Sequence, residues 1–500
     1  MTVTITGDPL TIEQVAAVAS GSVEVRLGEG VADRMGPARR VVDDALAAGD
    51  IVYGVTTGFG ALATTRVEPE MSAEMQVALV RSHAAGVGQP LPDEMVRAML
   101  LLRARTLSQG HSGIRPVVVE RIVEFLQRDI LPVVPGQGSV GASGDLAPFA
   151  HLALPLIGEG EVRVGGVVRP SADVLAEHGL PPIVLEAKEG LSLLNGTEGM
   201  LAFLALGIHR ARRIATAADL ACAMTVEAVL GSSRPYQAEV HALRPHPGQA
   251  ESARRIREAL EGSEIVASHR DDFTHAVQDA YSLRCAPQVH GAAVDVLDFA
   301  AATAACELGS VVDNPLVFPD TGEVVSAGNF HGQPLAFALD FVAIAVSEVA
   351  SISERRTDRI LDPDRSSGLP PFLATRPGFN SGLMLAQYTA AALVAENRVL
   401  SHPASIDSIP TSGLQEDHVS MGWGAGRKLD QVLANATRVI AVELICAAEG
   451  IGHRAPLQPG SRTGAARDVV RRVVAPLDQD RPPGPDIEAV ARLVEDGAFE

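Results

Sequence analysis

Apolar and polar positions in the second half of the chain repeat with the period of an α-helix. Between residues 334 and 358, apolar side chains recur mostly three or four positions apart, at Leu335, Ala338, Leu339, Val342, Val346 and Val349. This spacing places them on one face of a helix and does not match the alternation of a strand. The same texture predicts long helices over residues 197–230, 288–309, 334–358, 380–401 and 425–450. Several long helices in succession predict a helical bundle.

The first part of the chain has shorter and more varied patterns. Thr11 and Gln14 have the spacing of a capping box, which predicts a short helix after them. Residues 23–27 alternate as a strand does, and residues 94–108 and 116–128 read as helices. We therefore expect a mainly α-helical protein. A smaller mixed domain would cover residues 1–195, and a long-helix bundle with a C-terminal helical region would cover residues 196–500.

One uncharged segment raises the question of a membrane span. Residues 377–395 contain no charged side chain, but they open with Pro and Gly and include Asn380, Ser381, Gln387 and Thr389. A helix buried in a bundle or between subunits explains this composition better than a lipid-facing helix. We expect no membrane partner.

Composition excludes several classes of function. Asp and Glu outnumber Lys and Arg by 61 to 41, and the net charge of −20 argues against a nucleic-acid partner. Lysine occurs only at Lys188 and Lys428, and neither lies in a Gly/Ser-rich cradle, so pyridoxal phosphate is not expected. The four cysteines are far apart and form no CxxC pair, which predicts reduced thiols and no bound metal. With no signal-peptide pattern at the N-terminus, we expect a cytoplasmic protein.

The most unusual segment is rich in glycine. Gly136, Gly138, Gly141 and Gly144 fall within nine positions, and Ala142-Ser143 precedes the last of them. Two chemistries fit such a flexible backbone. The first three glycines match a dinucleotide-binding fingerprint, but prolines interrupt the strand that this motif requires. Alternatively, the Gly144 amide nitrogen could attack the Ala142 carbonyl, and loss of water would turn Ser143 into an alkene.

The surrounding motifs decide between these hypotheses. The chain resembles the aromatic amino acid ammonia-lyase family in ordered blocks from about residue 50 to 425. The blocks are residues 53–60 (YGVTTGFG), 81–86 (RSHAAG), 141–148 (GASGDLAP), 194–197 (LNGT), 278–285 (QDAYSLRC), 313–318 (DNPLVF), 328–331 (GNFH), 353–356 (SERR) and 415–421 (QEDHVSM). The resemblance implies a fold of the fumarase and histidase type, a homotetramer, and an N-terminal domain that carries a prosthetic group.

The resemblance also implies roles for individual residues. Ala142, Ser143 and Gly144 would form a methylidene-imidazolone group, with Asp145 assisting ring closure. Tyr53 would be the base that removes the β-hydrogen of an amino acid, on a loop made mobile by its glycines. The remaining family positions that contact the prosthetic group or the substrate are Asn195, Gln278, Tyr281 and Phe330.

Three residues bear on the substrate. Arg284 would bind the substrate carboxylate, because a guanidinium matches a carboxylate at two points. The sequence around His83 resembles the histidine-specific branch of the family, and Glu416 could accept a hydrogen bond from an imidazole N–H. These residues predict deamination of L-histidine to trans-urocanate. Thr56 and Val312 depart from the pattern frequent in that branch.

Other functions remain open from the sequence. The nearest alternative is a lyase or 2,3-aminomutase of the same family that acts on tyrosine or phenylalanine. An alternative of another class is a nicotinamide-dependent oxidoreductase that uses the glycine fingerprint. A non-catalytic helical scaffold would leave the residues around Ser143 and Tyr53 unexplained.

Overall fold

The computed structural model describes residues 2–62, 64–269 and 278–500 and is mainly α-helical. The chain forms two compact units. Unit 1 comprises residues 1–206, 301–340 and 403–427, and unit 2 comprises residues 207–300, 341–402 and 428–500. The division expected between residues 195 and 196 stays a prediction. The first passage from unit 1 to unit 2 falls near it, but two later stretches of chain return to unit 1.

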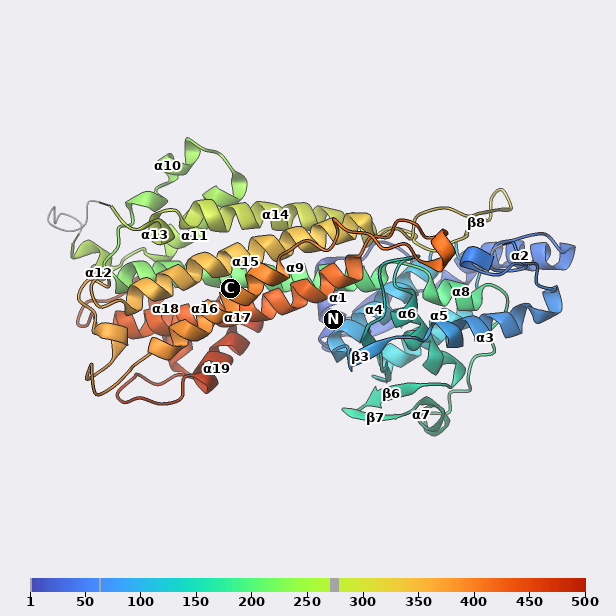
Figure 1. The fold of residues 1–500 in the computed structure, drawn as a ribbon, viewed down its shortest axis with the longest axis horizontal. Helices are drawn as coiled ribbons and strands as arrows, with labels where there is room; N and C mark the ends of the chain where they lie inside the picture. Colours follow the sequence, from blue (N-terminus) through green and yellow to red (C-terminus); the bar gives the residue numbers. More distant parts are fainter. Residues whose placement is uncertain (1, 63, 270–277) are drawn as a thin grey trace. The chain divides into compact units, whose positions relative to one another are not determined.

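Unit 1 combines short helices with small sheets (Figure 1). Its helices are α1 (Ile12–Ala19), α2 (Val31–Ala48), α3 (Ser72–His83), α4 (Asp93–Leu107), α5 (Pro116–Gln127), α6 (Leu146–Ala153), α7 (Ser171–Glu177) and α8 (Glu189–Leu194). Its strands are β1 (Thr2–Ile5), β2 (Glu24–Leu27), β3 (Val87–Pro90), β4 (Leu131–Pro132), β5 (Pro135–Gln137), β6 (Glu161–Val164), β7 (Val167–Pro170), β8 (Leu316–Phe318) and β9 (Glu323–Val325). The predicted capping box at Thr11 is confirmed, since Thr11 and Gln14 exchange hydrogen bonds of 2.9 and 3.2 Å.

The sheets of unit 1 do not form a dinucleotide-binding unit. β5, which opens the glycine-rich segment, pairs antiparallel with β3. No helix opens on Gly141; α6 begins only at Leu146. The fingerprint requires a strand that leads into a helix within a parallel βαβ unit. The structure therefore removes the support for an oxidoreductase.

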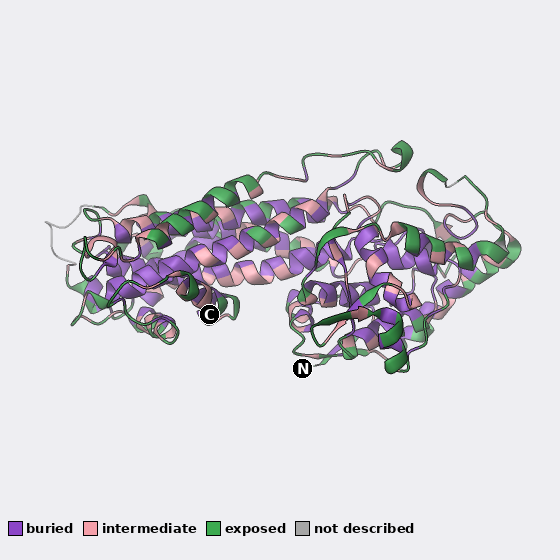
Figure 2. Ribbon diagram, turned by 60° about the horizontal axis from the view of Figure 1, so that its bottom comes forward, coloured by how far each residue is buried: buried purple, intermediate pink, exposed green. Residues whose placement is uncertain are grey.

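Unit 2 is dominated by long helices that run alongside one another, and their inward faces are buried (Figure 2). The long helices are α9 (Glu198–Ala228), α14 (Ala286–Glu307), α15 (Gln333–Leu361), α16 (Met384–Leu400) and α17 (Gly422–Gly452). All but α16 have residues in both units. The shorter helices are α10 (Ala238–Ala242), α11 (Pro247–Ala259), α12 (Glu264–Ala267), α13 (Tyr281–Arg284), α18 (Ser461–Arg471) and α19 (Gly484–Glu495). The five predicted long helices are confirmed.

Three described helices, α14, α15 and α17, are long and apolar enough to cross a membrane by length and composition. Two of them carry charged groups that pair inside the protein, because Arg356 of α15 and Glu443 of α17 form a fully buried ion pair. A charged side chain buried in a protein needs a partner of opposite charge. The pairing favours a protein core as the environment of these two helices.

Candidate active site

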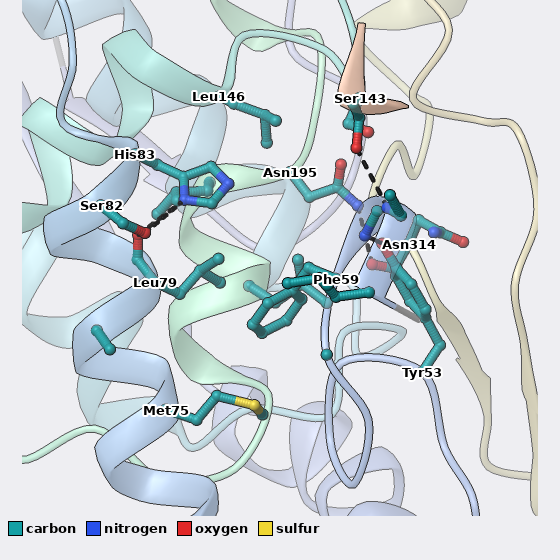
Figure 3. Close-up of a pocket in the computed structure, with 18 of the residues that line it drawn as sticks. Tyr53, Phe59, Met75, Leu79, Ser82, His83, Ser143, Leu146, Asn195 and Asn314 are labelled. Atoms are coloured by element: carbon teal, nitrogen blue, oxygen red, sulfur yellow. Dashed lines mark hydrogen bonds between the residues drawn. The ribbon is translucent and has the colours of Figure 1, made fainter. Parts of the chain in front are cut away.

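A cavity of about 620 Å³ in unit 1 gathers five of the predicted site residues (Figure 3). They are Tyr53, His83, Ser143, Asn195 and Glu416. Apolar side chains supply most of the remaining lining, namely Phe59, Ala61, Leu62, Val67, Met75, Ala78, Leu79, Leu146, Leu191 and Leu194. An apolar pocket with a few convergent polar groups is typical of a small-molecule site.

The backbone around Ser143 is tightly folded. Ser143 and Gly144 both have positive φ, +51° and +81°, and a Cβ atom on Gly144 would lie 1.9 Å from Gly196 O. Gly144 pairs with Gly196 in a parallel bridge made by Gly196 N to Ser143 O (3.3 Å) and Asp145 N to Gly196 O (2.8 Å). This pair of bonds does not use the Gly144 amide. Only glycine fits this position, since a side chain would clash with the facing backbone.

Asp145 is buried directly beneath this loop. Its Oδ2 accepts a hydrogen bond of 2.8 Å from Met200 N in the first turn of α9, so the carboxyl caps α9 and not its own helix α6. No hydrogen-bond donor among the described residues reaches Oδ1. Burial raises the pKa of Asp145 to about 8, and the nearby Glu198 acts in the same direction. At neutral pH the carboxyl therefore holds a proton.

Tyr53 lies on a loop that is held in place by contacts with nearby residues. Its phenolic oxygen accepts a hydrogen bond of 3.0 Å from Gly60 N, and its ring packs edge-on against Phe59. Gln76 of α3 donates to Gly54 O (3.1 Å) and accepts from Leu191 N (2.9 Å), so one buried amide joins the loop to α8. No sequence pattern marks Gln76 for this role, because an isolated glutamine on a helix is usually exposed.

Thr56, one of the two departures from the histidine-specific pattern, does not line the pocket. It is buried, and its hydroxyl donates to Asp50 O (2.5 Å) and accepts from Val52 N (2.9 Å). Val312, the other departure, is also buried and outside the pocket lining. Neither residue therefore contacts a molecule held in this cavity.

His83 and Glu416 both face the pocket. His83 Nδ1 lies 2.9 Å from Leu79 O, and because a carbonyl only accepts, Nδ1 carries the proton and Nε2 is left as an acceptor. Burial lowers the pKa of His83, while the bond to Leu79 and the charge of Glu416 oppose the shift. Glu416 Oε2 accepts from Thr411 Oγ1 (2.8 Å), and Oε1 lies 3.5 Å from Ser143 Oγ. One carboxylate oxygen thus faces the predicted reacting residue.

Asn195 is held by a chain of buried contacts. Its Nδ2 donates to Asn314 O (2.8 Å), whereas no described donor reaches its buried Oδ1. Asp313 accepts from Asn314 N (2.7 Å) and pairs with Lys188 Nζ (2.9 Å), both side chains being fully buried. Asn314 also lines the pocket. We assigned no role to it from the sequence, although it lies within one of the matching blocks.

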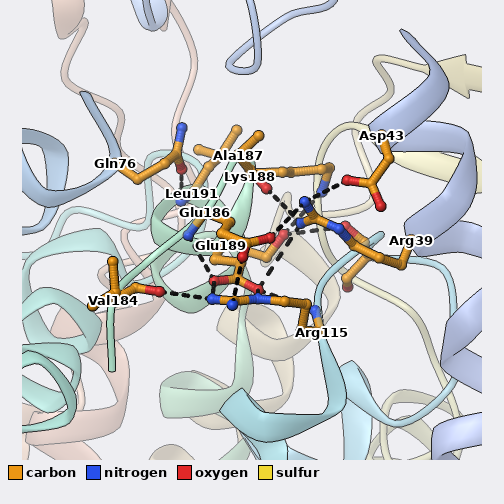
Figure 4. Close-up of polar contacts among 12 residues, drawn as sticks. Arg39, Asp43, Gln76, Arg115, Val184, Glu186, Ala187, Lys188, Glu189 and Leu191 are labelled. Carbon is orange, nitrogen blue, oxygen red and sulfur yellow. Dashed lines mark hydrogen bonds and ion pairs between the residues drawn. The ribbon is translucent and has the colours of Figure 1, made fainter. Parts of the chain in front are cut away.

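A second polar cluster supports the turn that carries Lys188 (Figure 4). The fully buried Glu189 accepts from Arg115 Nη2 (2.7 Å) and Nε (2.8 Å). Arg39 donates to Ala187 O (3.1 Å) and to Glu186 (3.0 Å). These bonds fix the residues just before α8. They explain how Lys188 holds a positive φ of +71°, which is unusual for a residue with a side chain.

Seven predicted site residues are not among those that line this pocket: Ala142, Gly144 and Asp145, which adjoin Ser143 in the chain, and four others. Gln278, Tyr281 and Arg284 belong to unit 2, and the Tyr281 side chain is 71% exposed. The Arg284 guanidinium stacks on the Tyr281 ring at 4.6 Å. Phe330 lies in unit 1, in a half-buried turn outside the lining.

Comparison with known proteins gives a consistent result. The family model described as "Aromatic amino acid lyase" matches residues 10–472. A histidine ammonia-lyase of Gloeobacter violaceus is 53% identical over 98% of this chain and 95% of that protein. A crystal structure of histidine ammonia-lyase from Trypanosoma cruzi has a TM-score of 0.92 at 42% identity, covering 100% of this chain and 94% of that one. A tyrosine aminomutase from Streptomyces globisporus has a TM-score of 0.95 at 39% identity, covering 100% and 98%.

Proposed function

The chain belongs to the aromatic amino acid lyase family, and we propose that it removes ammonia from L-histidine and leaves trans-urocanate. Glu416 carries the choice of substrate, because its carboxylate faces the pocket 3.5 Å from Ser143 Oγ. An imidazole N–H can donate to this carboxylate. A phenyl ring has no donor, so a bound phenylalanine would leave the carboxylate without a partner. The full-length similarity to histidine ammonia-lyases supports the same substrate.

We infer that Ala142, Ser143 and Gly144 form the methylidene-imidazolone group that the resemblance implies. Gly144 N would attack the Ala142 carbonyl carbon, and loss of two water molecules, one of them from the Ser143 hydroxyl, completes the ring. Two features fit this group. The tight positive-φ turn leaves Gly144 N outside the bridge to Gly196, and Asn195 and Asp145 each have a buried oxygen without a donor. Once formed, the group supplies an electrophilic carbon for the substrate amine.

Tyr53 is the group that we propose takes the β-proton. Tyr53 lines the same pocket as Ser143, and its phenolic oxygen accepts a hydrogen bond from Gly60 N that fixes its direction. Asp145, holding a proton, and Asn195 support the loop of Ser143. His83 Nε2 and the Glu416 carboxylate both offer acceptors to the substrate ring, so the single N–H of a neutral imidazole can pair with either residue.

The predicted residues that lie away from Ser143 in the sequence and outside the pocket lining would enter the site through assembly. We propose a homotetramer in which Gln278, Tyr281, Arg284 and Phe330 complete the pocket of a neighbouring subunit, with Arg284 binding the substrate carboxylate. Two observations support this. Tyr281 is 71% exposed in the single chain, and α16 leaves Leu385 and Tyr388 55% and 63% exposed. Apolar exposure of this size marks an interaction surface.

The location and the remaining partners follow from the same proposal. We expect a cytoplasmic enzyme whose only small-molecule partner at this site is an amino acid. A net charge of −20 disfavours nucleic acid as a partner. The ion pair between α15 and α17 disfavours a lipid environment for these helices.

The decisive experiment combines turnover with an intact mass. Purified protein incubated with L-histidine should release ammonia and develop the absorbance of urocanate, and it should do so far faster than it deaminates phenylalanine or tyrosine. The wild-type mass should be two waters below the mass of its sequence, and Ser143→Ala should restore the unmodified mass. Formation of β-tyrosine or β-phenylalanine, or an unmodified mass in active protein, would contradict the proposal.

A further inference from the structure

Three hydrogen bonds among the described residues attach the segment that carries Tyr281 and Arg284 to the rest of unit 2. Asp279 Oδ2 accepts from Ser232 N (2.8 Å), Ser282 O accepts from Arg356 Nη1 (3.3 Å), and Leu283 O accepts from Tyr236 Oη (2.9 Å). These contacts lie on the inward side of the segment, where Leu283 is fully buried, whereas Tyr281 is exposed. The backbone is therefore held from within while the Tyr281 side chain is exposed and Arg284 is half-buried.

Arg356 is itself fixed by buried partners. Its Nε and Nη2 donate to Glu443 at 2.5 and 2.8 Å, and both side chains are fully buried. Burial works against the charge, but the carboxylate of Glu443 outweighs it and raises the pKa of Arg356. Thr225 (2.8 Å) and Ser353 (2.6 Å) also donate to Glu443.

His290 closes the other side of the guanidinium. Its Nε2 lies 3.3 Å from Arg356 Nη1, and because arginine only donates, Nε2 must be the unprotonated nitrogen. Its Nδ1 then donates to Asp219 (2.8 Å), which also accepts from Ser252 (2.5 Å). Every member of this chain of contacts therefore has a defined donor or acceptor role.

A buried ion pair is a poor source of stability, because removing two charges from water offsets much of their attraction. An apolar pair of similar size would fill the same space. It could not, however, give Ser282 O a donor in a fixed direction. The Tyr236 hydroxyl acts in the same way on Leu283 O, and burial raises its pKa well above the ordinary value, so it stays a donor.

We propose that Tyr236 and Arg356 are positioning residues that hold the Tyr281–Arg284 turn in the geometry needed to act on substrate. Neither residue lines the pocket around Ser143, and they act through the backbone of the turn. The inference accounts for the 353–356 motif, in which Ser353 and Arg356 both bind Glu443. It rests on the proposed function for the roles of Tyr281 and Arg284.

Tyr236→Phe is the sharpest test, because it removes only the hydroxyl and keeps the buried ring. We expect kcat/KM to fall about five- to tenfold, the size expected for one lost hydrogen bond with a buried acceptor left unpaired. The melting temperature should stay close to that of the control Thr437→Val. This control also removes one buried hydroxyl in unit 2, but one that bonds to Leu433 O, away from the turn.

A double-mutant cycle separates positioning from a general loss of stability. In a Tyr281→Phe background, adding Tyr236→Phe should lower kcat/KM by a smaller factor than in the wild type, because the turn no longer presents the Tyr281 hydroxyl and positions Arg284 alone. The proposal is wrong if the fold-losses in kcat/KM of Tyr236→Phe and Tyr281→Phe multiply in the double variant. It is also wrong if Thr437→Val lowers kcat/KM as much as Tyr236→Phe does.

Hydrogen exchange tests the structural part without any assumption about the reaction. Backbone amides of residues 279–285 should exchange at least several-fold faster in Tyr236→Phe than in the wild type, whereas those of α3 should not change. Unchanged exchange in residues 279–285 would overturn the positioning role. Faster exchange in a protein that does not deaminate histidine would instead contradict the proposed function alone.

Discussion

Replacement of Glu416 by Gln gives the most direct test of how the pocket selects its substrate. Gln keeps the shape of the side chain and can still contact Thr411, which reaches Glu416 Oε2 at 2.8 Å. What it loses is the negative charge on the oxygen that faces Ser143 at 3.5 Å. The change therefore isolates the charge of the carboxylate from its packing.

The size of the effect follows from hydrogen-bond energetics. A bond to a charged group contributes about 1.5–3 kcal/mol, against about 0.5–1.5 kcal/mol for a neutral pair. The difference of about 1–1.5 kcal/mol corresponds to a loss of roughly 5- to 13-fold in kcat/KM for L-histidine. Activity on L-phenylalanine, which offers no N–H, should change much less, so selectivity for histidine should fall by a similar factor.

Asp417 provides the matched control. It is the adjacent carboxylate, it is exposed, and it does not line the pocket. Asp417→Asn removes the same charge one position away, and histidine turnover should stay near the wild-type value when followed by urocanate absorbance. Equal losses in the two variants, or less than a twofold loss in Glu416→Gln, would refute the assignment of Glu416 to the imidazole ring.

Three further predictions concern the base, the buried carboxyl and the assembly. Tyr53→Phe should lower turnover by roughly 10²- to 10⁴-fold or more with an unchanged circular dichroism spectrum, and near-normal turnover would mean that another group is the base. Asp145 has a folded pKa of about 8 against about 3.9 when unfolded, so the stability that its proton provides is complete below about pH 4 and is lost as pH rises through 8. Asp145→Asn cannot ionise, so its melting temperature relative to the wild type should rise between pH 5 and 8, and a constant difference would contradict the raised pKa. Light scattering should give the mass of a tetramer, and a fully active monomer would exclude sites shared between subunits.

The helical part of the fold could be predicted because its signal is local. All six apolar positions named between residues 334 and 358 are buried in α15, since a 3.6-residue period alone places them on one face. The strands of unit 1 are two to four residues long, and β3 pairs with β5 across more than forty residues of sequence. Such pairings depend on tertiary contacts and leave little pattern in the chain.

The site was predictable to a similar degree. Ser143, Tyr53 and Glu416 could be singled out because each lies in a block that resembles a known family. Gln76 could not, because its role depends on two backbone groups, Gly54 O and Leu191 N, that meet only in the folded protein. The position of Thr56 also depends on the fold. The residue departs from the pattern frequent in the histidine-specific branch, but its hydroxyl binds the backbone of its own loop and it does not line the pocket.

The burial of Lys188 has a practical consequence for chemical coupling. The chain has two lysines, and Lys188 is fully enclosed and paired with Asp313, while Lys428 at the start of the second turn of α17 is half-buried. Reagents that acylate lysine side chains should therefore attach at Lys428 and leave Lys188 intact. Because arginine replaces lysine over the rest of the surface, acylation of lysine side chains would change the charge at one position in each chain. The same scarcity lets a single added surface lysine define a new attachment point.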